Sequence, residues 1–128
     1  MNRFIFVDDD PEELFFIKDS FNQKSVSGVQ FFQEGNELVD FLHSLPEEKL
    51  PKVVVTDLNM PGMSGFELIQ AIRKHQRYQP VQIWVYTTSN LQSHQTTCLE
   101  LGATRFLVKP YSIEEYDQLV EELVKTGN

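Results

Sequence analysis

The sequence predicts an α/β domain in which a parallel sheet of five strands is covered by helices on both faces. Short apolar runs alternate with amphipathic segments along the whole chain of 128 residues. The runs Phe4–Val7 and Val53–Val55 are also continuously apolar, as expected of strands that are buried on both faces. Because right-handed crossovers join successive parallel strands, this alternation places helices on both faces of one sheet.

The predicted strands are short runs of apolar and β-branched residues. They are Phe4–Val7, Val29–Phe32, Val53–Thr56, Gln82–Thr87 and Arg105–Val108. The first helix is predicted to follow Asp10, a favourable N-cap, with Pro11 at its first position. The second helix is predicted from apolar residues at helical spacing, namely Leu38, Phe41, Leu42 and Leu45.

The third and fifth helices are predicted from capping boxes, in which Ser64 is followed by Glu67 and Ser112 by Glu115. The segment Leu91–Leu101 is the least regular of the predicted helices, because its apolar positions are few. Gly102 is expected to end it. We therefore expect the fourth helix to be the least firmly packed of the five.

Composition excludes several classes of protein. The formal net charge of −8 repels phosphate backbones and anionic head groups, so no direct binding to nucleic acid or membrane is expected. The single cysteine, Cys98, allows no internal disulfide and fits a reducing cytosol. No signal peptide and no segment of transmembrane length is visible. We expect a soluble, cytoplasmic protein whose partner is a protein with a basic patch.

Polar side chains stand where four of the predicted strands end. Asp8 and Asp9 follow the first strand, Asp57 follows the third, Thr87 ends the fourth, and Lys109 follows the fifth. Open parallel sheets bind ligands at the carboxyl ends of their strands. Three carboxylates at one edge repel one another unless a cation lies between them. Oxygen ligands without Cys or His favour Mg²⁺, so the sequence predicts a magnesium site.

A phosphoryl group on Asp57 would be held by Mg²⁺, by the ammonium group of Lys109 and by the hydroxyl group of Thr87. The Asp57 carboxylate would be the nucleophile, and the resulting acyl phosphate is labile enough for a reversible switch. Each residue alone also has an ordinary explanation as a turn residue, a helix cap or a surface lysine. Their common position at the ends of strands favours a site. The histidines show no ligand spacing and are expected at the surface; they are His43, His75 and His94.

Four motifs make the chain resemble the receiver domain of bacterial two-component response regulators, from Arg3 to about Val124. They are Phe6–Pro11, Thr56–Gly65, Val85–Ser89, and Gly102–Ala103 together with Phe106–Pro110. The resemblance implies a flavodoxin-like (βα)₅ three-layer sandwich with the strand order 2-1-3-4-5. Residues 1–128 would form a single receiver domain with no output domain.

The resemblance also implies roles for individual residues. Asp57 would accept the phosphoryl group, which Thr87 and Lys109 would contact. The residues implied to bind Mg²⁺ are Asp8, Asp9, Asp57 and Asn59, with Asp8 acting largely through water and Asn59 through its backbone carbonyl. Phe106 matches an aromatic side chain that changes rotamer as Thr87 moves, and Ser89 would tune the loss of phosphate. The Lys109–Pro110 bond would be cis, which suits a tight turn that aims the lysine inward.

The function implied is a Mg²⁺-dependent phosphorylation switch rather than an enzyme, with at most slow self-dephosphorylation. Its phosphoryl group would come from a histidine kinase or a phosphotransfer protein, and its output would pass to a downstream protein. A flavin carrier is one alternative, but the acidic loop Asp8–Asp10 would repel the cofactor's phosphate. A phosphohydrolase that uses Asp57 is another, but it would need a general acid, and Asn59 cannot fill that role.

Overall fold

The computed structural model describes residues 3–109 and 112–127 and contains the predicted parallel sheet. The strands are β1 (Phe4–Val7), β2 (Val29–Phe32), β3 (Val53–Thr56), β4 (Gln82–Thr87) and β5 (Arg105–Val108). All five have the bounds predicted from the sequence. They are parallel and lie in the order β2-β1-β3-β4-β5, which confirms the predicted topology.

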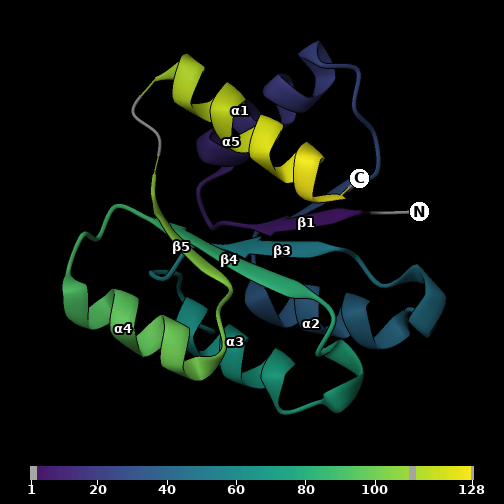
Figure 1. Cartoon of the computed structure of the whole chain (residues 1–128), viewed down its shortest axis with the longest axis vertical. Coiled ribbons are helices and arrows are strands. Elements are labelled where there is room, and N and C mark those ends of the chain that lie inside the picture. The colour runs from purple at the N-terminus through teal and green to yellow at the C-terminus, as the bar shows by residue number, and fades with distance from the viewer. Residues whose placement is uncertain (1–2, 110–111, 128) are drawn as a thin grey trace.

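The described residues also form five α-helices and two short 3₁₀ turns, and α5 follows the last strand. The helices are α1 (Pro11–Gln23), α2 (Gly35–Ser44), α3 (Gly65–Arg73), α4 (Gln92–Leu101) and α5 (Ile113–Gly127), and the turns are η1 (Glu47–Lys49) and η2 (Gln76–Tyr78). Helices α1 and α5 cover one face of the sheet, while α2, α3 and α4 cover the other (Figure 1). None of the helices in the described ranges has the length and apolar composition needed to cross a lipid bilayer.

The helix starts follow the predicted capping chemistry. The Asp10 carboxylate accepts a hydrogen bond from the backbone N–H of Glu12 at 3.0 Å, which caps α1. Ser64 and Glu67 form a reciprocal capping box at the start of α3. The Ser112 hydroxyl accepts from the Glu115 N–H at 3.2 Å, ahead of α5. These contacts fix where α1, α3 and α5 begin.

The core forms two layers, one on each side of the sheet. Alternation along β1 sends Phe4 and Phe6 toward α1 and α5, and Ile5 and Val7 toward α2 and α3. The layer under α1 and α5 is rich in aromatic rings and contains the fully buried Trp84. This packing fixes the positions of the strand ends, where the predicted site residues lie.

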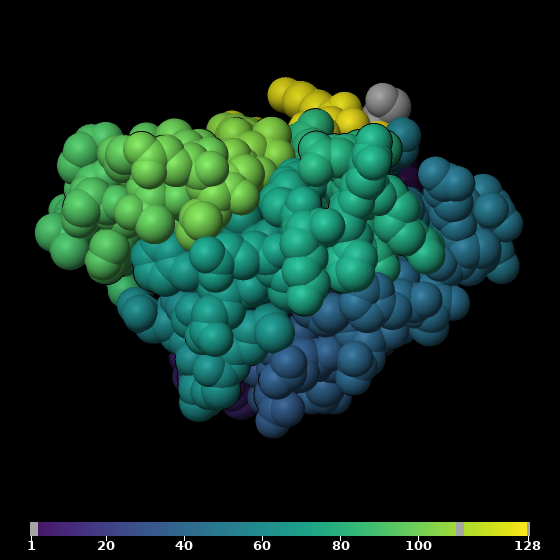
Figure 2. Space-filling model, turned by 90° about the horizontal axis from the view of Figure 1, so that it is seen from below, coloured from purple at the N-terminus to yellow at the C-terminus, as the bar shows by residue number. Residues whose placement is uncertain are grey.

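Helix α4 is the least anchored of the helices, as predicted. Among its residues only Cys98 is buried, while Leu99 is exposed and Leu91, its N-cap, is exposed as well. Gly102 ends α4 with φ at +114°, a conformation that favours glycine. Figure 2 shows the face that carries α2, α3 and α4, with α4 in green at its margin. The helix after β4 thus buries a single side chain in the core.

Candidate functional site

Parallel pairing brings the predicted site residues to one edge of the sheet. In the register, Val7 of β1 lies opposite Thr56 of β3, and Thr87 of β4 lies opposite Val108 of β5. Asp8 is therefore level with Asp57, and since Thr56 lies opposite Val85 of β4, Asp57 is level with Tyr86, one residue before Thr87. The backbone N–H of Lys109 continues the ladder by donating to the carbonyl of Thr87 at 2.8 Å. The four strand ends predicted to form a site do meet.

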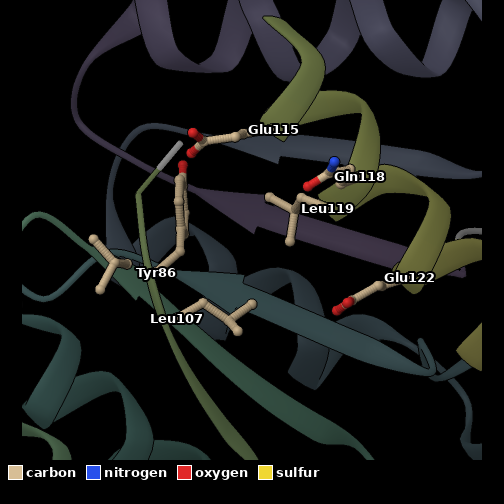
Figure 3. Close-up of a pocket in the computed structure, with 7 residues that line it drawn as sticks. Tyr86, Leu107, Glu115, Gln118, Leu119 and Glu122 are labelled. Atoms are coloured by element: carbon tan, nitrogen blue, oxygen red, sulfur yellow. The ribbon is translucent and has the colours of Figure 1, made fainter. Parts of the chain in front are cut away.

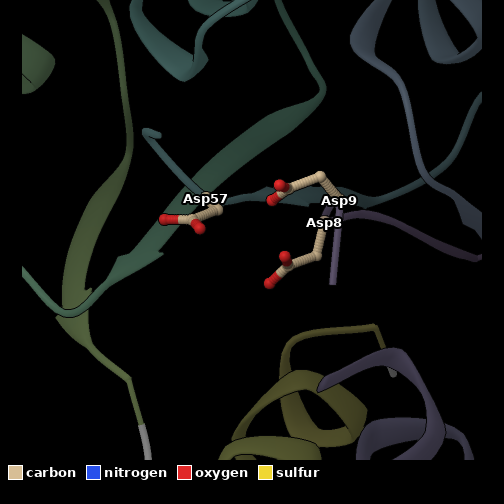
Figure 4. Close-up of side chains that lie close together, drawn as sticks. All are labelled: Asp8, Asp9 and Asp57. Carbon is tan, nitrogen blue, oxygen red and sulfur yellow. The ribbon is translucent and has the colours of Figure 1, made fainter. Parts of the chain in front are cut away.

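Three carboxylates gather at this edge. Asp8, Asp9 and Asp57 each offer one oxygen, and the three oxygens lie within 4.8 Å of one another. Figure 4 shows the side chains extending into a common space from the ends of β1 and β3. Asp8 and Asp57 are buried, whereas Asp9 is exposed. Partial burial, and then the charge of Asp8, raise the pKa of Asp9, because an added negative charge is unfavourable here.

Lys109 is the cation that links two of these carboxylates. Its Nζ lies 3.0 Å from Oδ2 of Asp8 and 3.0 Å from Oδ2 of Asp57. Burial by itself lowers the pKa of Lys109, but the hydrogen bonds and charges of Asp8 and Asp57 outweigh burial and raise it overall. Lys109 therefore stays charged beside the predicted phosphoacceptor.

The charges and donor atoms of the cluster fit a hard divalent cation. Three carboxylates and one ammonium group leave two uncompensated negative charges. The donor set within this cluster consists of carboxylate oxygens alone, which is the chemistry that Mg²⁺ prefers. Asn59 lies exposed in the loop after β3, and its carbonyl as a metal ligand stays a prediction.

Asp57 is held firmly at the end of β3. Its Oδ1 accepts from the N–H of Leu58 at 2.7 Å, and its backbone carbonyl accepts from the hydroxyl of Thr56 at 2.8 Å. The first residue of α3, Gly65, packs against this backbone so closely that a Cβ there would overlap with the carbonyl oxygen of Asp57. Glycine at position 65 therefore lets α3 approach the site, and the Asp57 carboxylate keeps a fixed direction.

Asp8 has a buried partner that sequence reasoning missed. The hydroxyl of Tyr86 donates to Oδ2 of Asp8 at 2.8 Å, and the N–H of Asp10 donates to Oδ1 at 3.0 Å. Burial, and then the charge of Asp8, raise the pKa of Tyr86 well above its ordinary value, so the hydroxyl stays protonated as a donor. A tyrosine inside a fully buried strand needs a polar partner, and this was the available signal.

Thr87 connects the site to α4. It is fully buried, and its Oγ1 accepts from the N–H of Ser89 at 3.3 Å. The Ser89 hydroxyl in turn pairs with Nδ1 of His94 at 2.7 Å, and His94 also packs its ring edge-on against Phe66. The expected surface position is thus only partly right for His94, which is half-buried and is linked to Thr87 by two hydrogen bonds through Ser89. No spacing in the sequence signals this contact.

Two further predicted residues lie farther along the chain. Phe106 is half-buried in β5 and packs against the core layer beneath α2 and α3. Its rotamer change stays a prediction. Pro110, and with it the predicted cis bond after Lys109, lies outside the described residues.

Comparison with known proteins gives a consistent result. The family model of the response regulator receiver domain matches residues 4–121. A chemotaxis protein CheY homologue from Campylobacter jejuni is 28% identical over 126 residues, covering 98% of this chain and 95% of that protein. The structure of chemotaxis response regulator CheY4 from Vibrio cholerae has a TM-score of 0.80 at 25% identity and covers 96% of this chain and 98% of that one. The phosphorylated cyanobacterial phytochrome response regulator RcpA shares the fold, with a TM-score of 0.83 at 19% identity over 98% of this chain and 93% of that one.

Proposed function

The chain belongs to the response regulator receiver family and is a receiver domain of the CheY-like type, and we propose that Asp57 is its phosphoacceptor in a Mg²⁺-dependent reaction. The single observation that carries this proposal is the position of Lys109. Its ammonium group lies 3.0 Å from the Asp57 carboxylate and 3.0 Å from that of Asp8, beside oxygen atoms suited to a divalent cation.

Asp57 has the geometry expected of the nucleophile. The N–H of Leu58 holds one carboxylate oxygen and Lys109 holds the other, so the group is oriented before a donor arrives. A carboxylate oxygen would attack the phosphorus of a phosphohistidine, on a histidine kinase or phosphotransfer protein. The bond between phosphorus and nitrogen would break, and the electron pair would return to the imidazole ring. The product on Asp57 is an acyl phosphate.

The neighbouring residues would stabilise the transferred group. Lys109 places a fixed positive charge where negative charge develops, and the Thr87 hydroxyl offers a donor on the adjacent strand. Asp8, Asp9, Asp57 and the carbonyl of Asn59 would hold Mg²⁺, which supplies charge neutralisation for the phosphoryl oxygens. With these groups in place, the transfer requires only that the reactants are correctly positioned and that the charge on the phosphoryl group is stabilised.

The signal would leave through the loop after β4. Thr87 is tied to Ser89, and Ser89 is tied to His94 of the weakly anchored α4, so a shift of Thr87 toward a phosphoryl group would disturb this helix. Ser89 and Phe106 would tune the lifetime and the readout of the phosphorylated state. A downstream protein would read the change.

A hollow of about 330 Å³ next to these elements offers one surface for such contacts. It lies between β5 and α5, and Leu107 and Leu119 give it an apolar floor while Glu115 and Glu122 stand at its rim (Figure 3). Glu122 is paired with Arg105 at 2.7 Å, so this rim carries charge of both signs.

The proposal is tested by labelling the protein with acetyl phosphate and Mg²⁺. The variant Asp57→Asn removes the nucleophilic oxygen and should abolish labelling, measured by intact-protein mass or by a phosphate-affinity gel. Asp10→Asn is the matched control, because Asp10 caps α1, asparagine is an equally good cap, and this carboxylate is not part of the cluster. Labelling that persists in Asp57→Asn would show that another residue is the acceptor.

A further inference from the structure

Tyr86 contacts the carboxylate cluster in a way that the phosphotransfer scheme leaves unexplained. It is fully buried in β4, directly before Thr87, and its hydroxyl donates to the equally buried Asp8 across 78 residues of sequence. We propose that Tyr86 is a positioning residue of the metal site, which fixes the direction of the Asp8 carboxylate and thereby sets the affinity for Mg²⁺. This inference rests on the metal site of the proposed function.

The donors to Asp8 are not equivalent. Oδ1 accepts from the backbone of Asp10, while Oδ2 accepts from both Tyr86 and Lys109. Lys109 is shared with Asp57, and in the proposed reaction it turns to the phosphoryl group. Once Lys109 has turned away, Tyr86 is the side chain that still donates a hydrogen bond to Oδ2 of Asp8. Its hydroxyl keeps Asp8 oriented, and satisfied as a buried acceptor, through every state of the site.

Tyr86 is rigid enough for this task. Its ring packs edge-on against Phe6, with centroids 6.3 Å apart at 82°, and Nζ of Lys109 lies 5.3 Å from the ring centroid. A ring held on these sides has little rotamer freedom, so its hydroxyl oxygen stays in one place. Groups that hydrogen-bond to metal ligands typically change metal affinity 10- to 100-fold when they are removed.

The variant Tyr86→Phe removes one oxygen atom and keeps the ring. We expect its Mg²⁺ dissociation constant, measured by isothermal titration calorimetry, to rise about tenfold or more. Labelling by acetyl phosphate should require correspondingly more Mg²⁺, yet reach close to the wild-type rate at saturating Mg²⁺, because Asp57, Thr87 and Lys109 are unchanged. A loss of metal affinity with the maximal rate retained is the signature of positioning.

Tyr78→Phe provides a matched control. Tyr78 is also buried, and its hydroxyl pairs with His43 at 2.6 Å, but the two are not among the residues of the carboxylate cluster. This variant should lose a buried hydroxyl contact without changing the affinity for Mg²⁺. Equal affinity in Tyr86→Phe and wild type would overturn the inference, as would equal losses in both tyrosine variants. If the wild-type protein bound no Mg²⁺, the metal site itself would be wrong, which is a separate outcome.

Discussion

At the scale of single residues, the site is a buried network with more acceptors than donors. Asp8 and Asp57 share the one ammonium group of Lys109, and Tyr86 supplies a further hydrogen bond to Asp8. Breaking a buried ion pair by removing one partner typically costs about 3–5 kcal/mol, since it leaves an uncompensated charge. Each protonated donor in this network therefore supports the fold as well as the chemistry.

The network predicts a loss of stability at high pH. Burial, and then the charge of Asp8, raise the pKa of Tyr86 above its ordinary value of 10.0. The bonds and charges of Asp8 and Asp57 raise the pKa of Lys109 above 10.5 despite the opposing and larger single effect of burial. When the folded pKa is the higher one, the stabilisation is complete below the unfolded pKa and is lost as pH rises through the folded one.

We therefore expect the free energy of unfolding, measured with urea, to be nearly constant up to about pH 8.5. It should fall gently from about pH 9, because burial raises the pKa of the Cys98 thiol to about 11, and steeply above about pH 10, where Tyr86 and Lys109 add to the loss. Tyr86→Phe should reduce the steepness without removing it, because Lys109 still titrates and Tyr116, bonded to Glu13, also has a raised pKa. An identical alkaline slope in Tyr86→Phe and wild type would contradict the role given to this hydroxyl.

At the scale of elements, the strands were predictable because each apolar run is closed by a polar residue. The run Val53–Val55 stops at Thr56 and Asp57, and β3 ends there. The polar contacts that join elements were not predictable. The bonds from Tyr86 to Asp8 and from Ser89 to His94 depend on strand register and on the angle at which a helix leaves its loop. The sequence placed the acidic residues at one edge and indicated that a buried Tyr86 needs a polar partner, but it did not indicate which side chain that partner is.

Arg73 also makes polar contacts between elements that the sequence did not predict. Because it joins several elements, we expect its substitution to lower the free energy of unfolding strongly. From the last turn of α3, its guanidinium donates to the carbonyls of Gly102, Tyr78 and Val81 at 2.9, 2.9 and 2.7 Å. It thus fastens the end of α4 and the start of β4 to α3. Arg73→Met should lower the free energy of unfolding by about 3 kcal/mol, because carbonyls lose a charged donor.

Two variants sharpen the test by urea unfolding. Arg73→Lys should recover little of the lost stability, since a single ammonium group cannot reproduce a planar guanidinium that donates to several separate carbonyls. Arg77→Met is the matched control, because Arg77 is exposed and bonds the single carbonyl of Leu45. Its loss should stay below about 1 kcal/mol. Equal losses for Arg73→Met and Arg77→Met would refute this view of Arg73.

At the scale of the whole molecule, the proposed metal links the site to global stability. A ligand that binds the folded state alone stabilises it by RT ln(1 + [L]/Kd), which is about 1.4 kcal/mol at ten times the dissociation constant. For a domain of this size, we expect the melting temperature to rise by roughly 5 °C. The chain carries a net charge of −8, so ionic strength must be matched with KCl to separate screening from binding.

The variant Asp9→Asn separates specific Mg²⁺ binding from ionic screening. Asp9 is the exposed member of the cluster, and its replacement leaves the buried bonds of Asp8 and Asp57 intact. The raised pKa of Asp9 means that its charge is disfavoured in the folded state, and stability from its protonated form is lost as pH rises through the folded pKa. At neutral pH without metal, Asp9→Asn should therefore melt at a higher temperature than wild type. With Mg²⁺ this difference in melting temperature should narrow or reverse, since the variant has replaced a charged carboxylate ligand by a neutral amide oxygen. Parallel rises in both proteins at matched ionic strength would indicate non-specific binding, and would rule out Asp9 as a ligand.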